Sequence, residues 1–201
     1  MWNSLEEVAA SVRSCVDCPL HRGRLNAVPG AGDPEARIMF IGEGPGYHED
    51  AQGLPFVGAA GNLLNELLGE IGLRREQVFV ANVIKCRAPQ NRDPLPEEIE
   101  ACSKYLDRQI ELLDPEVIVT LGRFSMGRFM PGERISRVHG SARKVDGRTV
   151  LAVYHPAAAL HQPSLRQTLS EDFKRIVAAL EAAAPAPEPA PQQSARQLNL
   201  F

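Results

Sequence analysis

The side chains best suited to chemistry in this sequence follow short apolar runs. The first run leads into the glycine-rich turn Gly42–Gly46 (GEGPG), and the second ends near Asn82. Gly122 follows the third run, and His155 follows the fourth within the segment HPAA. Ligands of open parallel sheets bind beyond the carboxyl ends of the strands. If the four runs are parallel strands, a turn, an amide and an imidazole meet at one edge, which predicts a binding site there.

Each of these features alone has a structural explanation. GEGPG suits an ordinary turn after a strand, because the sequence has neither the GxGxxG spacing of a dinucleotide site nor a GxxxxGK[ST] phosphate loop. A lone Asn82 or His155 is more often a hydrogen-bonded structural residue. The functional interpretation therefore depends on their recurrence at equivalent strand ends.

The four cysteines of the chain form a second candidate site. Cys15 and Cys18 lie in a C-x-x-C-P segment, whereas Cys86 and Cys102 are 16 positions apart. Structural disulfides are rare in cytoplasmic proteins, so we expect metal ligation. A second C-x-x-C pair would favour zinc, and three separate locations suit a cubane 4Fe–4S cluster somewhat better. Spacing alone leaves both metal centres open.

The elements that must position these residues alternate along the chain. Four runs are nearly continuous in apolar residues, as in strands buried on both faces: Arg37–Ile41, Val78–Val83, Val117–Leu121 and Thr149–Tyr154. The helical segments are Asn62–Ile71, Pro96–Leu113, Arg123–Met130 and Ser164–Ala183. Alternating strands and helices indicate a parallel sheet with helices on both sides. We therefore predict a three-layer α/β/α fold with a central, mainly parallel four-stranded sheet.

Composition predicts one domain and a tail. Hydrophobic residues make up 44% of the 201-residue chain, which is enough for a core over residues 1–183. Residues 184–196 are a Pro/Ala-rich linker, and residues 197–201 end the chain with apolar side chains. No apolar run reaches membrane-spanning length, and the N-terminus lacks the basic segment of a signal peptide. We expect a cytoplasmic protein with no membrane segment.

Charge is unevenly distributed along the chain. The net charge is −3, which argues mildly against nucleic-acid binding, but residues 121–150 carry seven basic side chains against two acidic ones. The basic ones are Arg123, Arg128, Arg134, Arg137, Arg143, Lys144 and Arg148. This excess suits contacts with a few phosphates, and it equally suits a salt-bridged surface. Charge alone does not decide between the two.

Taken together, GEGPG, EDAQGLPFVGAAG, NVIKCR and HPAAAL resemble the motifs of the family 4 uracil-DNA glycosylases, with cysteines at matching places over roughly residues 12–180. The resemblance implies a uracil-DNA glycosylase-like fold and a base-excision repair enzyme. Such an enzyme hydrolyses the N-glycosidic bond of deoxyuridine in DNA, releasing uracil and leaving an abasic site. It also implies a 4Fe–4S cluster, held by Cys15, Cys18, Cys86 and Cys102, that organises loops near the DNA. We expect a nucleoid-associated monomer.

The resemblance assigns roles to individual side chains. A base must leave the duplex to enter a pocket, where Phe56 matches the aromatic residue that stacks on it. Asn82 matches the amide that accepts from uracil N3–H and donates to O4, a polarity that cytosine reverses. His155 matches the donor to O2, where charge develops as uracil leaves. Gly42 and the turn that it begins complete the uracil site with backbone N–H groups.

The residue that holds the attacking water differs from the best-known pattern. Better-known members of the superfamily have an aspartate where this chain has Gly44. Glu43 is the catalytic candidate in its place, followed by Glu49 and Asp50. A carboxylate there can hold the water or stabilise the oxocarbenium-like sugar, and both roles stay open.

Further residues are expected to contact DNA. Leu160, in the segment 159–166, matches a wedge that enters the minor groove, and Arg87 and Arg92 are candidate phosphate contacts. The pair Tyr47-His48 departs from the usual acidic pattern and is expected near the C5 edge of uracil, where it bears on thymine exclusion.

Two other functions fit parts of the sequence, namely a covalent or non-covalent uracil-DNA binding protein of the same superfamily and a redox iron–sulfur protein. One branch of the superfamily binds uracil-DNA covalently through a histidine in an insert, but residues 87–101 contain no histidine, which favours turnover. A redox iron–sulfur protein would leave Phe56, Asn82 and HPAA without a purpose. The C-terminal Gln197–Phe201 (QLNLF) resembles the peptide with which bacterial repair proteins bind the sliding clamp, so we expect this partner besides DNA.

Overall fold

The computed structural model describes residues 2–160 and 162–183, which form a single mixed sheet between two layers of helices. The strands found in these ranges are β1 (Ala31–Gly32), β2 (Ile38–Gly42), β3 (Phe79–Asn82), β4 (Val117–Leu121), β5 (Ala142–Val145) and β6 (Arg148–Val153). Their order in the sheet is β1-β3-β2-β4-β6-β5. The central neighbours β3, β2, β4 and β6 are parallel, whereas β1 and β5 pair antiparallel at the two edges.

The α/β prediction is confirmed, but the predicted four-stranded sheet was too small. The described sheet has six strands, and the two edge strands escaped prediction for different reasons. β1 is only two residues long, and β5 carries exposed side chains instead of an apolar run. Both therefore lack the apolar pattern by which buried strands are found in a sequence.

The helices of the described ranges vary widely in length. They are α1 (Leu5–Ser14), α2 (Tyr47–Gln52), α3 (Ala59–Glu70), α4 (Pro96–Leu113), α5 (Arg123–Phe129), α6 (Ile135–Val138), α7 (Pro156–Ala159) and α8 (Pro163–Ala183). Single 3₁₀ turns occur at η1 (Pro19–Arg22), η2 (Arg75–Gln77) and η3 (Pro89–Asn91). α4 begins with proline and two glutamates, residues that suit a helix N-terminus, and it has the bounds predicted from the sequence.

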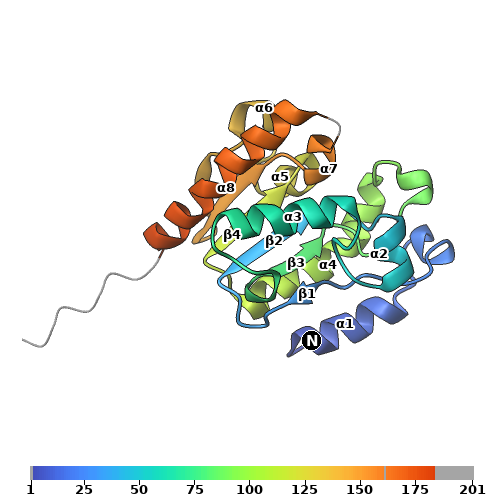
Figure 1. The fold of residues 1–201 in the computed structure, drawn as a ribbon. Coiled ribbons are helices and arrows are strands. Elements are labelled where there is room, and N and C mark those ends of the chain that lie inside the picture. The colour runs from blue at the N-terminus through green and yellow to red at the C-terminus, as the bar shows by residue number, and fades with distance from the viewer. Residues whose placement is uncertain (1, 161, 184–201) are drawn as a thin grey trace, which may run out of the picture.

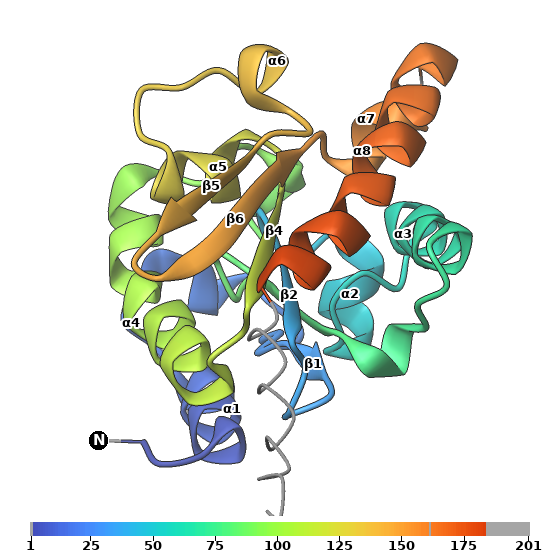
Figure 2. The ribbon, with the colours of Figure 1, turned by 90° about the vertical axis from the view of Figure 1, so that its left-hand side faces the viewer.

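Helices cover both faces of the sheet (Figures 1 and 2). α3 and α8 lie on one face, where their leucines and Phe173 pack against Phe40 of β2. α4 and α5 lie on the other face, where they pack against the neighbouring strand residues Met39 and Ile41. Because successive strand side chains point to opposite faces, each central strand supplies both cores.

The strand register brings the predicted functional residues to one edge. Gly42 at the end of β2 pairs with Asn82 at the end of β3, and Leu121 of β4 pairs with Val153 of β6. His155 lies two residues after the end of β6 and caps the N-terminus of α7. The carboxyl ends of three strands therefore surround one region.

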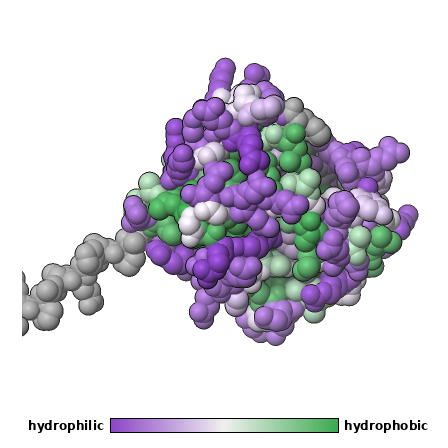
Figure 3. Space-filling model, viewed as in Figure 1, coloured by the Kyte–Doolittle hydropathy of each residue, from purple (hydrophilic) through white to green (hydrophobic). Residues whose placement is uncertain are grey.

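The face of the molecule seen in Figure 1 is predominantly polar. Figure 3 shows hydrophilic residues over most of the face seen in Figure 1, with hydrophobic residues scattered among them. No helix in the described part of the chain combines the length and apolar character needed to cross a membrane. The predicted linker 184–196 and terminal peptide 197–201 lie outside the described residues.

Gly61 provides a test of how tightly α3 packs below the sheet edge. A Cβ at Gly61 would lie 1.8 Å from the carbonyl oxygen of Phe56, whereas a Cβ at Gly69, in the same helix, would meet nothing within 4 Å. We predict that Gly61→Ala lowers the free energy of unfolding by about 1–3 kcal/mol because backbone must shift. Gly69→Ala should raise it by about 0.5–1 kcal/mol through helix propensity. Urea unfolding of both variants measures this, and equal effects would contradict the close packing.

Candidate functional site

A cavity of about 280 Å³ opens beyond the carboxyl ends of β2, β3 and β6. Its lining includes four residues predicted from the sequence, Glu43, Phe56, Asn82 and His155. The remaining lining residues are Gly44, Pro45, Gly46, Glu49, Ala60, Ile84, Ala88, Asn91, Arg92 and Ala157. Residues that are far apart in the chain therefore form one pocket. Glu43, Asn82 and His155 were expected there from their positions after strands, and Phe56 from the family resemblance.

Asn82 presents an amide without a partner to this cavity. The residue is 1% exposed, and neither its Oδ1 nor its Nδ2 finds a hydrogen-bond partner among the described residues. Buried side-chain amides are normally hydrogen-bonded, and an unsatisfied one costs about 1–3 kcal/mol. A ligand with a matching donor and acceptor would remove this cost.

Gly42 does not line the cavity but lies against its two main side chains. A Cβ at this position would be 2.4 Å from Asn82 Oδ1 and 2.7 Å from the Phe56 ring. The absence of a side chain at Gly42 therefore lets the amide and the ring approach each other. Phe56 is 7% exposed, and its φ of +54° places it in the left-handed region that non-glycine residues rarely adopt.

Glu49 holds the loops that carry this ring. Its Oε1 accepts hydrogen bonds from the N–H groups of Val57 and Gly58, both at 2.9 Å, and its Oε2 accepts one from Gly46 at 3.1 Å. One carboxylate thus joins the GEGPG turn to the residues after Phe56. The sequence drew attention to Glu49 as a reserve base, but these bonds give it a structural role.

His155 is held as a neutral hydrogen-bond donor. Its Nδ1 accepts from the backbone N–H of Ala157 at 3.1 Å, so the ring proton is on Nε2. Burial lowers the pKa of His155 to about 4, against a weaker opposite effect of Glu49. The ring also stacks on Phe56, with centroids 5.6 Å apart. A neutral imidazole that donates from Nε2 suits a ligand oxygen on which charge develops.

Glu43 is the carboxylate of the pocket that backbone bonds do not occupy. Burial raises the pKa of Glu43, assisted by Asp93 and opposed by Arg123, which makes its carboxylate a stronger base. Asp50, the other reserve candidate, is buried away from the cavity and accepts from the N–H groups of Leu25 and Asn26. Glu43 therefore suits the catalytic role better than either reserve residue.

The pocket explains why residue 44 has no side chain. A Cβ at Gly44 would be 2.6 Å from the side chain of Ile84, so an aspartate there would require Ile84 to move. Sequence reasoning missed Ile84 and Asn91 as lining residues. Ile84 lies within the NVIKCR motif but carries no polar group that would single it out, and Asn91 belongs to no motif with a recognisable spacing.

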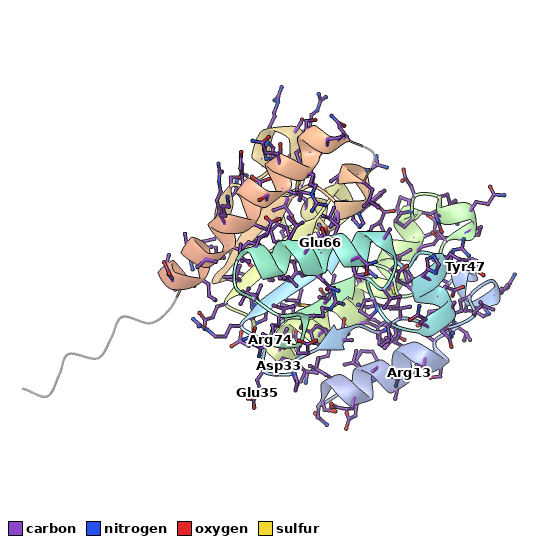
Figure 4. All side chains as sticks on the ribbon, viewed as in Figure 1. Arg13, Asp33, Glu35, Tyr47, Glu66 and Arg74 are labelled. Carbon is purple, nitrogen blue, oxygen red and sulfur yellow. The ribbon has the colours of Figure 1, made fainter. Side chains whose placement is uncertain are left out.

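Tyr47 and His48 do not line the cavity. Tyr47 is 58% exposed, at the start of α2 beside the loop that carries η3 (Figure 4), and the guanidinium of Arg87 lies over its ring. Tyr47 and His48 were expected near the C5 edge of uracil, but neither is among the residues that line the cavity.

The predicted DNA contacts lie around the pocket in different environments. Arg92 lines its edge but forms a two-pronged ion pair with the buried Glu98. Arg87 lines an adjoining groove and donates to Asn91 at 2.8 Å. Leu160 is 43% exposed at the end of α7, as a wedge requires.

Much of the basic segment 121–150 is neutralised by acidic partners. Four of its seven basic side chains form ion pairs, namely Arg123–Asp93, Arg128–Asp107, Arg143–Glu133 and Arg148–Asp114. For these four, a salt-bridged surface is the better interpretation than a phosphate grip.

The four cysteines line a second, narrower cavity between α1 and α4. Arg24 Nη1 lies 3.0 Å from Cys86 Sγ, and the backbone N–H of Lys85 donates to Cys102 Sγ at 3.2 Å. Burial raises the pKa of Cys102 to about 11, so a bound cation is needed to make it a thiolate at neutral pH. In the described ranges, no three His, Cys, Asp or Glu residues were found placed to hold a single metal ion.

Comparisons with known proteins agree with this geometry. Residues 29–181 match the family model described as the uracil DNA glycosylase superfamily. The chain is 50% identical to the type-4 uracil-DNA glycosylase of Archaeoglobus fulgidus, over 86% of this chain and 92% of that protein. It is 52% identical to the enzyme of that name from Sulfurisphaera tokodaii, over 87% and 84% of the two chains. For the Thermotoga maritima type-4 enzyme the identity is 45%, over 85% and 92%.

The protonation of His155 is directly testable. Because burial lowers its pKa to about 4, its imidazole should stay neutral as the pH falls through 6.5 and should protonate only near pH 4. The unfolded chain takes up this proton at a higher pH than the folded protein. The free energy of unfolding should therefore decrease as the pH falls from 6.5 to about 4. Nitrogen NMR of the ring measures the titration and the Nε2–H tautomer. A midpoint near 6.5, or a proton on Nδ1, would refute the assigned state.

Proposed function

Because this chain belongs to the type-4 uracil-DNA glycosylases of the uracil DNA glycosylase superfamily, we propose that its pocket hydrolyses the N-glycosidic bond of deoxyuridine in DNA. Uracil is released, water adds to the sugar at C1′, and an abasic site remains. The unpartnered amide of Asn82 is the single observation that supports this substrate best.

Base choice follows from the polarity of the Asn82 amide. Uracil N3–H can donate to Oδ1, while Nδ2–H can donate to uracil O4. Cytosine offers an acceptor at N3 and a donor at its amino group, so both contacts oppose like polarities as long as the Asn82 amide keeps this orientation. Each mispaired buried group costs about 1–3 kcal/mol, enough to exclude the normal base strongly.

Phe56 and His155 have different roles in the reaction, binding the base and stabilising it as it leaves. Phe56 offers its aromatic ring to the flipped base, since it lines the cavity. His155 donates its Nε2 proton to O2 of the leaving uracil without being charged itself. The N–H of Gly46 already donates to Glu49, so it is not available to assist at O2.

Glu43 completes the proposed machinery. Its carboxylate can accept a proton from the attacking water, and its negative charge can stabilise the developing sugar cation. A covalent capture of the sugar by histidine is less well supported. His139 is bound to Asp172 at 2.9 Å and does not line the cavity.

One assay distinguishes these functions. The protein is incubated with an oligonucleotide that contains one deoxyuridine. Free uracil with an abasic site indicates the glycosylase, a heat-stable protein–DNA adduct indicates covalent capture, and neither product indicates an unrelated function.

Asn82→Asp tests the proposed reading of the base in the same assay. An ionised carboxylate cannot donate to O4, so kcat/KM on the uracil substrate should fall at least about tenfold. Discrimination against cytosine should weaken too. A variant with the rate and selectivity of the wild type would remove Asn82 from the site.

We also propose that Cys15, Cys18, Cys86 and Cys102 hold a 4Fe–4S cluster. Their placement around one cavity supports it, as do the N–H groups that point to Cys86 and Cys102. A single zinc ion would need sulfurs within about 2.3 Å of one point, which a larger cluster does not require. When bound, the cluster would cross-link η1, the loop after β3 and α4.

Metal content decides between cluster and zinc. Protein purified without oxygen should contain about four irons per chain and absorb broadly in the visible range. Cys→Ser at one ligand should lower the free energy of unfolding markedly, because ligand loss frees the loops. The kcat of the protein that remains folded should change much less. Stoichiometric zinc without iron would refute the cluster.

The terminal peptide Gln197–Phe201 is proposed to bind the bacterial sliding clamp. The linker 184–196 can span at most roughly 45 Å, so the enzyme would search DNA near the clamp at raised effective concentration. Deleting the peptide should abolish clamp binding and leave the cleavage of a short oligonucleotide unchanged. A chain with these five residues shuffled is the control, and equal clamp binding by all three chains would refute the assignment. A monomeric state and a cytoplasmic, nucleoid-associated location stay predictions.

A further inference from the structure

Lys85 is a buried lysine whose side chain contacts only neutral oxygens. It is 1% exposed, and its Nζ donates to the carbonyl oxygen of Asn82 at 2.9 Å and to Gln109 Oε1 at 2.6 Å. Burying an ammonium group without a counter-charge is costly, so its retention calls for a reason.

The contact with Asn82 lies where the sheet ends. β3 ends at Asn82, so the Asn82 carbonyl is the last of the strand. Lys85, three residues further along the chain, donates a hydrogen bond to this carbonyl from its Nζ. Gln109, on α4, extends this hydrogen-bond chain, because its Nε2 donates to the Pro29 carbonyl at 2.7 Å. A buried chain of hydrogen bonds thus fixes the peptide plane from which the Asn82 amide projects.

The backbone of the same residue faces the cysteines. The N–H of Lys85 donates to Cys102 Sγ at 3.2 Å, its carbonyl accepts from Val28 at 2.7 Å, and Cys86 follows it in the chain. Lys85 therefore stands between the pocket that reads the base and the cysteine cavity, and its side chain and main chain contact both.

We propose that Lys85 is a positioning residue that connects the two sites, orienting Asn82 through its carbonyl and supplying a buried positive charge beside the cysteine cavity, which Lys85 lines. This inference rests on the proposed function and cofactor. Metal-bound cysteines are thiolates, so the cavity gains negative charge close to an ammonium that has no carboxylate partner in the described ranges. The position of the amide matters because small displacements of a reading group in a binding pocket lower its efficiency sharply.

Two substitutions separate the two roles. Lys85→Met removes both the charge and the bond to Asn82. Gln109→Glu keeps an oxygen acceptor for Lys85 Nζ and places a carboxylate on the ammonium, but it loses the Nε2 donor to the Pro29 carbonyl. Lys174→Met is the matched control, since Lys174 is an exposed lysine of α8 that lines neither cavity. Iron-loaded protein is used throughout.

Two measurements report on these roles, one for each role, and neither requires catalytic turnover. The affinity for free uracil, followed by NMR titration well below the unfolding temperature, reports the orientation of Asn82. The half-life of the visible absorbance in the presence of a chelator reports how firmly the cluster is held.

Lys85→Met should weaken uracil binding about tenfold and shorten the half-life at least about fivefold. Gln109→Glu should shorten the half-life and leave uracil affinity within about twofold, and Lys174→Met should change neither. Uracil affinity unchanged in Lys85→Met would overturn the positioning role, and an unchanged half-life in both variants would overturn the charge role.

If Lys85→Met does not fold, Gln109→Met tests the positioning instead, because it removes the second anchor of the ammonium. Uracil binding should then weaken about threefold with iron retained, and wild-type affinity would overturn the role. If the proposed function itself is wrong, the wild-type protein will neither bind nor release uracil, which distinguishes this case from a failure of the Lys85 proposal. An iron-free wild type would refute the cofactor and the charge role while uracil binding still tests the contact with Asn82.

Discussion

The pairing of Gly42 with Asn82 in the register of β2 and β3 is the constraint on which the site depends. Because residue 42 has no side chain, the amide of Asn82 and the ring of Phe56 occupy the space that a Cβ would need. A shift of the register by one residue would turn Asn82 to the other face of the sheet. The pocket is therefore a consequence of strand pairing, and the loops only complete it.

Several groups around this pair are held in states that cost stability. The Asn82 amide is buried without a partner, Phe56 adopts a positive φ, and His155 is kept neutral by burial. Such strain persists only where the surrounding structure fixes it. Here the fixing elements are the three N–H groups bound by Glu49 and the apolar layers on both faces of the sheet. Bound uracil would satisfy the amide, so part of the cost is recovered as recognition.

Local patterns predicted the parts of the molecule that local sequence determines. The four central strands and α4 follow from apolar runs and helix-start signals, and the positions after these strands located the pocket residues. The sequence could not indicate that Glu49 joins two loops, that Ile84 fills the space beside Gly44, or that Arg123 pairs with Asp93. These contacts depend on how separate segments meet, and no spacing within one segment encodes them. The same holds for Lys85, whose partner Gln109 lies on a different element.

The proposed recognition of uracil depends on one contact, that of the Asn82 amide with the flipped base. Its most direct test is an NMR measurement of the Asn82 side-chain Nδ2–H₂ signal. An oligonucleotide carrying a deoxyuridine analogue with a non-hydrolysable glycosidic bond is added, and the matching deoxycytidine oligonucleotide is the comparison. We predict that the analogue shifts the signal and protects it from exchange with water, and that the cytosine oligonucleotide leaves it unchanged. A signal that responds equally to both, or to neither, would contradict the assignment of this pocket to uracil.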